Sequence, residues 1–294
     1  MTRSAMPFIG SEALATGAFT KRTLRSRNQL IHRNVYLPAG QRLTPAIAAW
    51  LWSGRDATVA GMSAAALHGT NWIDADLPAE LCRAEGAANG IVVHRDVLRS
   101  DEICLKDGIS VTTPARTAFD IGRRSAETTA VVRLDALANA TGLTGDAVLA
   151  VAEHHPGVRG IVRLRTVVDL MDGGAESPQE TRTRLLLVRS GLRRPQTQIN
   201  VARWRIDMGW EEFLVGVEYD GPQHWTDPSI RNRDIEKYAQ LAERGWLIIR
   251  VNSELLRYRP HVVVQRVCAA LRAHDCPWLD ECGVDPRFFT RSVA

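Results

Sequence analysis

Three acidic residues in the carboxy-terminal part of the sequence have the spacing that a metal-dependent hydrolysis needs. Glu218 and Asp220 end a hydrophobic run two residues apart, so in a strand both side chains project to the same side of the sheet. Asp207 ends the preceding predicted strand. If the two strands are neighbours, the three carboxylates converge beside Gly221 and offer the oxygen ligands that Mg²⁺ prefers. A metal held there can activate water and stabilise an in-line displacement at phosphorus.

Each of these residues also has an interpretation that needs no chemistry. Alone, Asp207 would be a strand-end turn residue and His224 a loop histidine. Glu180 falls three residues after a serine, where a capping box accounts for it without a catalytic role. Glu218 and Asp220 are harder to explain in this way, because two acids ending one strand raise each other's pKa unless a cation lies between them. That pair therefore favours a metal site or an active site.

The sequence predicts helices and strands in an order that would position these acids. A capping box opens a helix just after the glycine- and proline-rich boundary at 171–178, and two alternating segments follow it as a strand pair. The apolar run that carries Glu218 is nearly continuous, as expected for a strand buried on both faces. The expected elements, in chain order, are a helix over 178–190, strands over 198–201, 204–208 and 213–219, a helix capped by Asp234 and ended by Gly245, a strand over 246–251, and a helix over 253–274 interrupted at Pro260.

This order of elements resembles the PD-(D/E)xK restriction-endonuclease-like nuclease superfamily. The segment Val217–His224, with Arg205–Asp207 before it and Gly245–Arg250 after it, is more closely similar to the bacterial family of unknown function related to very-short-patch-repair endonucleases. The resemblance covers roughly residues 175–256. It implies a restriction-endonuclease-like domain, with a central mixed sheet flanked by helices, and a dependence on Mg²⁺ or Mn²⁺.

The resemblance also implies a role for each matched residue. Asp207 and Glu218 would be metal ligands, and Glu180 would orient a ligand or a water. His224 would transfer a proton or contact a phosphate. Asp220 stands where the general motif has lysine, so either Asp220 is a third metal ligand or a positive charge comes from elsewhere. The candidates for that charge are Lys237 on the next helix and Arg231 and Arg233 before it.

The first forty residues carry a concentrated positive charge. Residues 1–40 contain six Lys and Arg against the single acid Glu12, a local charge of +5, whereas the whole chain has a net charge of +4. A basic end on a nearly neutral body suggests a polyanionic partner. We expect a helix over 8–15, a second helix capped by Thr20 and running to about Leu30, and a strand over 31–37. This order is that of a winged helix-turn-helix, whose second helix reads the major groove. The plainer alternative is a solvated basic helix.

The amino-terminal part resembles the regulator-type winged-helix proteins related to abortive-infection type IV antitoxins. The resemblance rests on residues 8–40, Ser63–Gly69 and Val111–Thr117. It implies DNA binding by exposed basic residues, namely Lys21, Arg22, Arg25, Arg27 and Arg33. The expected organisation is a winged-helix DNA-binding region over 1–42, a mixed α/β middle region of the antitoxin-like type over 43–172, and a restriction-endonuclease-like nuclease domain over 173–294.

Composition limits the class of protein. The chain has 294 residues, of which 45% are hydrophobic and 24% charged, so it can bury a sizeable core and most of it is not disordered. Five cysteines, odd in number and thinly spread, do not form a disulfide framework. His274, Cys276 and Cys282 match no strong zinc spacing. No apolar stretch reaches the roughly 20 residues of a membrane helix. We therefore expect a cytoplasmic protein with no membrane association.

Two functional hypotheses follow from the sequence. The leading one is a Mg²⁺-dependent DNA endonuclease or nickase that an amino-terminal winged helix targets to DNA. The alternative is a winged-helix transcriptional regulator or type IV antitoxin-like protein with an inactive nuclease-like domain, which the absent motif lysine favours. The expected partners are DNA, a second copy of the chain in a homodimer and, under the regulator hypothesis, a cognate toxin.

Overall fold

The protein divides into two compact units. The structure, a computed structural model, describes residues 6–221 and 228–288, and of residues 228–231 the backbone alone. One unit comprises the residues up to 130 together with 140–169, and the other comprises 131–139 together with the chain from 170 onward. The finer division at residues 42 and 172 stays a prediction.

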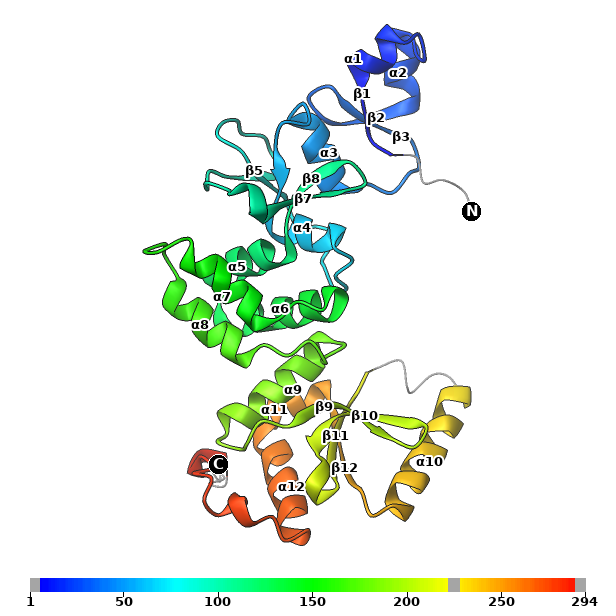
Figure 1. The fold of residues 1–294 in the computed structure, drawn as a ribbon. Coiled ribbons are helices and arrows are strands. Elements are labelled where there is room, and N and C mark those ends of the chain that lie inside the picture. Colours follow the sequence, from blue (N-terminus) through cyan, green and yellow to red (C-terminus); the bar gives the residue numbers. More distant parts are fainter. Residues whose placement is uncertain (1–5, 222–227, 289–294) are drawn as a thin grey trace. The chain divides into compact units, whose positions relative to one another are not determined.

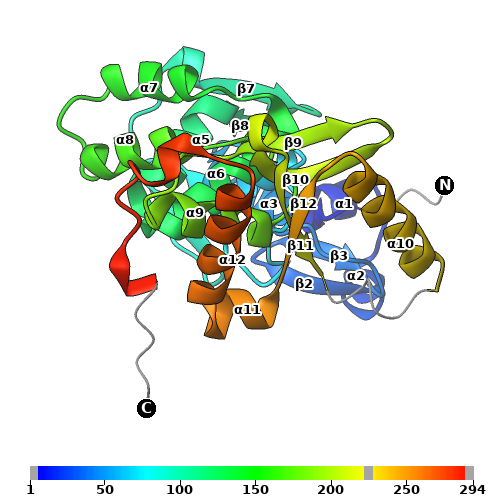
Figure 2. The same cartoon turned by 90° about the horizontal axis from the view of Figure 1, so that it is seen from below.

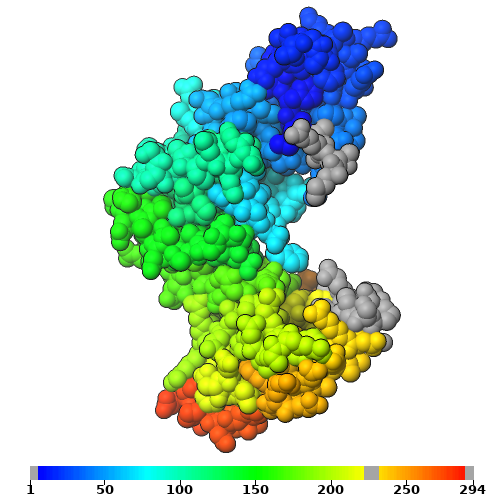
Figure 3. Space-filling view, turned by 45° about the vertical axis from the view of Figure 1, so that its right-hand side comes forward, coloured from blue at the N-terminus to red at the C-terminus, as the bar shows by residue number. Residues whose placement is uncertain are grey.

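The first unit begins with a strand, two short helices and a β-hairpin (Figure 1). These are β1 (Phe8–Ile9), α1 (Gly10–Ala15), α2 (Lys21–Arg27), β2 (Asn28–His32) and β3 (Val35–Pro38), with the strands in the order β1-β3-β2. Thr20 caps α2, because its side-chain oxygen accepts the backbone N–H of Thr23 at 3.2 Å. Leu24 is the buried residue of α2. In the space-filling view of Figure 3 the blue N-terminal segment lies at the surface.

The predicted boundaries of this region were partly wrong. The first helix starts at Gly10 because the residues before it pair with β3, and α2 ends at Arg27 where β2 begins. The single strand expected from Ile31 is a hairpin. Its turn contains Asn34 in the left-handed region at φ 64°, a conformation that asparagine tolerates. The side-chain oxygen of Asn34 accepts the N–H of Ser11 at 2.9 Å, which ties the hairpin to α1.

The rest of the first unit combines a mixed five-stranded sheet with helices. The strands stand in the order β6-β5-β4-β8-β7, with parallel pairing in β5–β6 and β4–β8 and antiparallel pairing in β4–β5 and β7–β8. The elements are α3 (Pro45–Trp52), β4 (Thr58–Val59), α4 (Gly61–Leu67), β5 (Ala79–Cys82), β6 (Ile91–His94), β7 (Ile103–Lys106), β8 (Ile109–Thr112), α5 (Pro114–Arg124), α6 (Glu127–Thr141), α7 (Gly145–Glu153) and α8 (Ile161–Leu170).

The Val111–Thr117 motif of this unit builds a buried ionic network. Thr113 caps α5 and Pro114 takes its first position, which turns Arg116 inward until its side chain is 1% exposed. Its guanidinium donates to Asp120 at 2.9 Å and pairs with Glu102. A buried guanidinium needs such partners, because an unpaired charge in the interior is strongly destabilising. The motif is therefore explained by the packing of α5.

The second unit is built on a four-stranded sheet in the order β12-β11-β10-β9. Strand β10 (Trp204–Trp210) is antiparallel to both of its neighbours, β9 (Gln196–Val201) and β11 (Val215–Asp220), and β12 (Leu247–Asn252) is parallel to β11. Helix α9 (Pro178–Arg189) precedes the sheet, α10 (Pro228–Glu243) connects β11 to β12, and α11 (Ser253–Tyr258) and α12 (Pro260–Ala273) follow. Figures 1 and 2 show α12 and α10 on opposite sides of this sheet.

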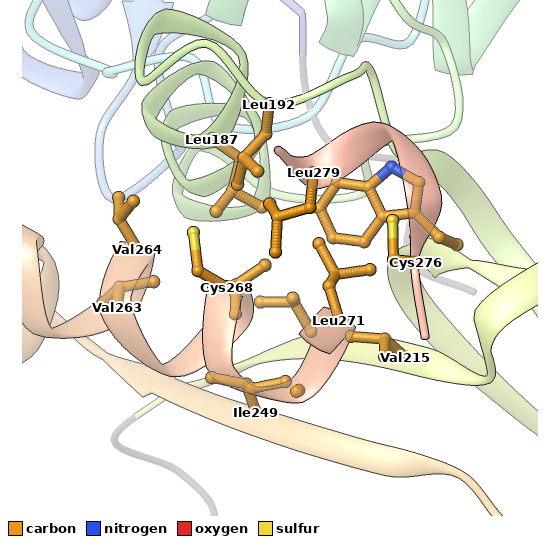
Figure 4. Close-up of a cluster of buried hydrophobic side chains, with 14 of the residues drawn as sticks. Leu187, Leu192, Val215, Ile249, Val263, Val264, Cys268, Leu271, Cys276 and Leu279 are labelled. Atoms are coloured by element: carbon orange, nitrogen blue, oxygen red, sulfur yellow. The ribbon is translucent and has the colours of Figure 1, made fainter. Parts of the chain in front are cut away.

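The sheet has an apolar core on each face. On one face Leu187 of α9 and the inner residues of α12, among them Val264 and Leu271, pack on Val215 and Ile249 (Figure 4). On the other face Leu241 of α10 belongs to a second core cluster, which includes Ile199, Trp204, Ile206 and Trp246. Burial on both faces explains why the β11 sequence is nearly continuous in apolar residues.

Most predicted elements of the second unit are confirmed, with two corrections. The capped helix over 178–190, the order of the strands and the interruption at Pro260 are present. Asp234 was wrongly predicted as a helix cap, because α10 begins at Pro228 and Asp234 lies within it. Asp207 is not at the end of a strand but inside β10, which continues to Trp210.

The structure can be compared with two expectations drawn from the composition, one about the cysteines and one about membrane helices. The five cysteines are free thiols. Among the residues that the structure describes, no helix combines the length and the apolar character that crossing a membrane requires.

Candidate active site

At Asp207 the side chains of strand β10 change sides, so that the residues before and after it pack into different cores. Ile206 belongs to the core on the α10 side, whereas Met208 belongs to the core on the α9 and α12 side. In a regular strand these two residues would share a face. The β9–β10 pairing is also interrupted here, between Ile206↔Ile199 and Met208↔Thr197, and the intervening Gln198 has a φ of 54°. This local irregularity turns the Asp207 carboxylate toward the residues of β11.

The carboxylate of Asp207 continues the hydrogen bonding where the β10–β11 ladder stops. The final backbone pair toward this end is Met208↔Val217, and the N–H of Tyr219 donates to Asp207 Oδ2 at 2.8 Å. Burial and the neighbouring charges of Glu180 and Glu218 raise the pKa of Asp207 to about 7. An aspartate that resists ionisation in this way is stabilised by a bound cation.

Glu218 is a buried carboxylate held by two residues of α10. The Tyr238 hydroxyl donates to Glu218 Oε2 at 2.7 Å, and the Lys237 ammonium lies 2.5 Å from Oε1 as an ion pair. The side chain of Glu218 is only 6% exposed. Apart from this ion pair, Oε1 has no hydrogen-bond partner in the described part of the chain. One oxygen of Glu218 is thus held by a hydrogen bond, and the other faces the Lys237 ammonium.

Asp220 faces a different partner. Its Oδ2 accepts from Nε of Arg250, at 2.7 Å, and Arg250 lies on the parallel neighbour β12. The Arg250 guanidinium also covers the ring of Tyr238 at 4.6 Å from its centroid. Burial of the phenol, together with the proximity of Glu218 and Asp220, raises the pKa of Tyr238 far above its usual value, so the hydroxyl stays a donor. Two positive side chains, Lys237 and Arg250, therefore face the pair of acids whose motif position holds no lysine.

Glu180 makes the contacts expected at the start of a capped helix and acts on Asp207 through its charge. Its Oε2 accepts the N–H of Glu176 at 2.9 Å and its own N–H donates to Ser177 Oγ at 3.2 Å, as in a capping arrangement. Glu180 is also buried, which raises the pKa of its carboxyl, and its charge acts on Asp207. Glu180 therefore lies close enough to influence the site while serving as the cap of α9.

Three sequence candidates have other outcomes. His224 lies outside the described residues, as does the side chain of Arg231. Arg233 is exposed and stacks on Trp204 rather than approaching the acids. Sequence reasoning missed Tyr238 as a site residue, because its position on α10 suited a core residue equally well. Its place directly after Lys237, on the helix that follows the acidic strand, was the available signal.

The donors of this site fit a divalent cation held by few protein ligands. Within the described ranges, no group of three or more His, Cys, Asp and Glu side chains lies close enough together to hold a metal ion. Mg²⁺, however, commonly takes one or two carboxylates and completes its shell with waters and substrate phosphate. Glu218 Oε1, which accepts no hydrogen bond from the described residues, and the raised pKa of Asp207 are the two features that such an ion would satisfy.

The basic residues predicted to bind DNA are all accessible. Four belong to α2 and one to the hairpin turn of the first unit, and all five side chains are exposed: Lys21, Arg22, Arg25, Arg27 and Arg33. Asn28, which falls within the helix predicted to run to about Leu30, lies in β2 instead. The structure thus keeps the positive charge of this region at the surface.

Comparison with known proteins identifies two classes of domain in the chain. Residues 57–170 match the family model described as AbiEi antitoxin C-terminal domain, and residues 180–271 match the restriction-endonuclease-like family model REase_MTES_1575. Both predicted resemblances are thereby confirmed. The chain is 28% identical over 187 residues to the uncharacterized proteins Rv2248 and MT2308 of Mycobacterium tuberculosis, from strains ATCC 25618 / H37Rv and CDC 1551 / Oshkosh, in an alignment covering 62% of this chain and 68% of each relative.

Proposed function

We propose that this protein binds DNA and hydrolyses its phosphodiester bonds with a metal-dependent, restriction-endonuclease-like domain. The observation that carries the proposal is the meeting of Asp207, Glu218 and Lys237, with one carboxylate oxygen left without a hydrogen-bond partner in the described part of the chain. The mixed sheet with helices on both faces supports the restriction-endonuclease-like architecture in this domain.

In this proposal Asp207 and Glu218 hold Mg²⁺ or Mn²⁺. The ion, when bound, supplies charge stabilisation at the phosphate and favours ionisation of water. We assign Asp220 to Arg250 instead of to the metal, because the arginine already occupies its carboxylate. Glu180 adjusts the charge around Asp207 from the end of α9.

The remaining residues of the site orient these two ligands. The Tyr219 N–H fixes the rotamer of Asp207, and the Tyr238 hydroxyl fixes Oε2 of Glu218. Lys237 places a positive charge beside Glu218 from α10, and preorganised positive charge stabilises the transition state of phosphoryl transfer. His224 is the candidate for proton transfer that the family resemblance implies.

The first unit supplies DNA binding. We propose that residues 1–42 form a winged helix in which α2 and the β2–β3 hairpin present the basic side chains to DNA. Contacts of Lys and Arg with phosphates give affinity without sequence preference. The sequence-specific part of recognition then comes from the exposed side chains of α2.

A second candidate function is favoured by one specific observation. The match to the AbiEi antitoxin C-terminal domain covers residues 57–170, so the chain suits a DNA-binding regulator as well. Under that hypothesis the nuclease-like domain is inactive, and a cognate toxin is the expected partner. Asp220 in the place of the motif lysine points in this direction, whereas Lys237 beside Glu218 points toward activity.

Plasmid nicking decides between the two functions. The purified protein is incubated with supercoiled plasmid in Mg²⁺, Mn²⁺ or EDTA, next to Glu218→Gln and the matched control Glu281→Gln. Glu281 is an exposed glutamate that pairs with Arg193, at 3.8 Å. Nicking that needs metal, disappears in Glu218→Gln and persists in Glu281→Gln supports the nuclease. DNA binding with no nicking in either metal supports the regulator.

A further inference from the structure

Two arginine guanidinium groups lie over the indole ring of Trp204. The guanidinium carbon of Arg203 lies 4.7 Å from the ring centroid and that of Arg233 lies 5.8 Å from it. Trp204 itself is held rigidly, since it is 7% exposed and its Nε1 donates to Gln240 Oε1 at 2.9 Å. The two guanidinium groups therefore sit on one fixed platform formed by β10 and α10.

The two arginines differ in whether they have an acidic partner. Arg203 pairs with Glu236, and both side chains are more than half exposed. Arg233 is exposed and makes no ion pair with any carboxylate in the described part of the chain. Two like charges beside one ring repel each other unless an anion joins them. A guanidinium held by an aromatic ring is preorganised for two-pronged binding of a phosphate.

The platform lies next to the candidate active site. Arg233 and Lys237 are four residues apart on α10, so they share a face of that helix and are separated by about 6 Å along its axis. Trp204 precedes Asp207 on the same strand, and its side chain packs on the face of the sheet that α10 covers. Arg233 thus stands one helical turn from the lysine that touches Glu218, a separation on the scale of neighbouring phosphates in a nucleic acid strand. Arg203 lies over the same indole ring as Arg233.

We propose that Arg203 and Arg233 bind a backbone phosphate of DNA next to the phosphate that is cut. This inference rests on the proposed function for the position of the cut, but the binding itself does not require cleavage. It assigns a substrate with several consecutive phosphates, so the site acts on an internal phosphodiester bond of a DNA strand rather than on a mononucleotide.

The test measures DNA binding in EDTA, where no cleavage occurs. The affinity of the full-length protein for a short DNA duplex is followed by fluorescence anisotropy over a range of salt concentrations. Loss of the one phosphate contact that the two arginines share, in Arg203→Gln/Arg233→Gln, should lower the slope of log affinity against log salt by about 0.9, since each neutralised phosphate contributes about 0.9. The variant Arg203→Lys/Arg233→Lys should retain most of the slope, because it retains both positive charges.

Arg193→Gln is the matched control. Arg193 also covers a tryptophan, with its guanidinium carbon 5.2 Å from the ring centroid of Trp278, and its guanidinium lies near an exposed glutamate. Its removal should leave the salt slope unchanged. If Arg193→Gln lowers the slope as much as the double variant, the effect is one of general charge and the inference is wrong.

Two further results separate this inference from the proposed nuclease activity. A double variant that binds and nicks like the parent overturns the inference and leaves the nuclease standing. A reduced slope in a protein that never nicks DNA supports the phosphate site while the nuclease proposal fails. Should the double variant not fold, Arg233→Gln alone gives the answer, because this exposed residue has no ion pair to lose in the described structure. This single substitution should lower the slope measurably, by up to about 0.9.

Discussion

At the scale of single residues, the site brings several carboxylates close together, and the neighbouring positive side chains do not fully balance their charge. Asp207 lies near Glu180 and Glu218, and only Lys237 among the groups acting on it through charge lowers its pKa. Such an arrangement lowers the stability of the metal-free protein, because keeping the carboxylates ionised close together costs free energy. Removing one of these charges should therefore raise the free energy of unfolding by a measurable amount.

Asp207→Asn should stabilise the metal-free protein at pH 8. The pKa of Asp207 is about 7 in the folded state against an ordinary value of 3.8, so the folded state binds the proton more tightly. Stability from this group is therefore present below about pH 4 and is lost as the pH rises to about 7. The full shift corresponds to about 4 kcal/mol at most, and we expect a gain of about 1–3 kcal/mol from the substitution.

Urea denaturation in EDTA at pH 8 and pH 4.5 measures this gain. Asparagine keeps an oxygen that can accept the N–H of Tyr219, so the local geometry is retained. The gain should shrink at pH 4.5, where the wild-type aspartic acid is largely protonated. A variant that is destabilised equally at both pH values would show that Asp207 carries no electrostatic penalty.

Tyr238→Phe should slow nicking while DNA binding in EDTA stays unchanged. The substitution removes the donor to Glu218 Oε2. A hydrogen bond to a charged group is worth about 1.5–3 kcal/mol, which corresponds to a loss of roughly tenfold to a hundredfold in rate or metal affinity. The nicking rate as a function of Mg²⁺ concentration reports both quantities.

Tyr258→Phe serves as the control for the loss of a phenol, since Tyr258 is 66% exposed. Higher Mg²⁺ concentrations should partly restore the rate of Tyr238→Phe if the hydroxyl positions Glu218 for the ion. A Tyr238→Phe protein with parental rates at every Mg²⁺ concentration would remove Tyr238 from the site.

At the scale of elements, the site depends on the close approach of β10 and β11. A Cβ at Gly209 would lie 2.2 Å from the carbonyl oxygen of Val215, which is backbone and cannot move aside by changing a rotamer. Gly209→Ala should therefore push the two strands apart and destabilise the second unit by about 1–3 kcal/mol, as overpacking does. Gly283→Ala is the matched control, because a Cβ there meets nothing within 4 Å.

Chemical denaturation of both glycine variants tests this prediction. Gly209→Ala should also reduce nicking more than its stability loss explains, since Asp207 lies on the displaced strand. Equal stability of the Gly209→Ala and Gly283→Ala proteins would contradict the close packing of β10 on β11.

The elements show how far the sequence determines this site. Ser177, Pro178 and Glu180 specify the start of α9 through local hydrogen bonds, so sequence reasoning places that helix correctly. The start of α10 was missed because Asp234 has the side chain of a cap but lies inside a helix that begins at Pro228. The left-handed Gln198 and the change of face at Asp207 depend on pairing between strands, which no local pattern of residues reveals. The partners of Asp220 and Glu218 likewise come from β12 and α10.

At the scale of the whole molecule, the chain joins an antitoxin-like region to a restriction-endonuclease-like domain. In our proposal the first unit finds DNA and the second cuts it. The two roles should then be separable by substitution, because the basic side chains of α2 and the acidic residues of the site belong to different compact units. Reversing charges on α2 should weaken DNA binding without abolishing cleavage of the DNA.

Lys21→Glu/Arg25→Glu should therefore weaken DNA binding across all sequences, by about tenfold or more at low salt, and reduce the salt slope. The control Arg163→Glu/Arg165→Glu makes the same change in net charge on exposed residues of α8. Anisotropy titrations measure the affinities, and nicking at saturating DNA should stay near the parental rate in both variants. If the α2 and α8 variants lose affinity equally, the effect reflects net charge alone and α2 is not the DNA-binding helix. If the α2 variant binds weakly and also fails to nick at saturating DNA, the two units do not act separately, and the winged helix takes part in placing the DNA for cleavage.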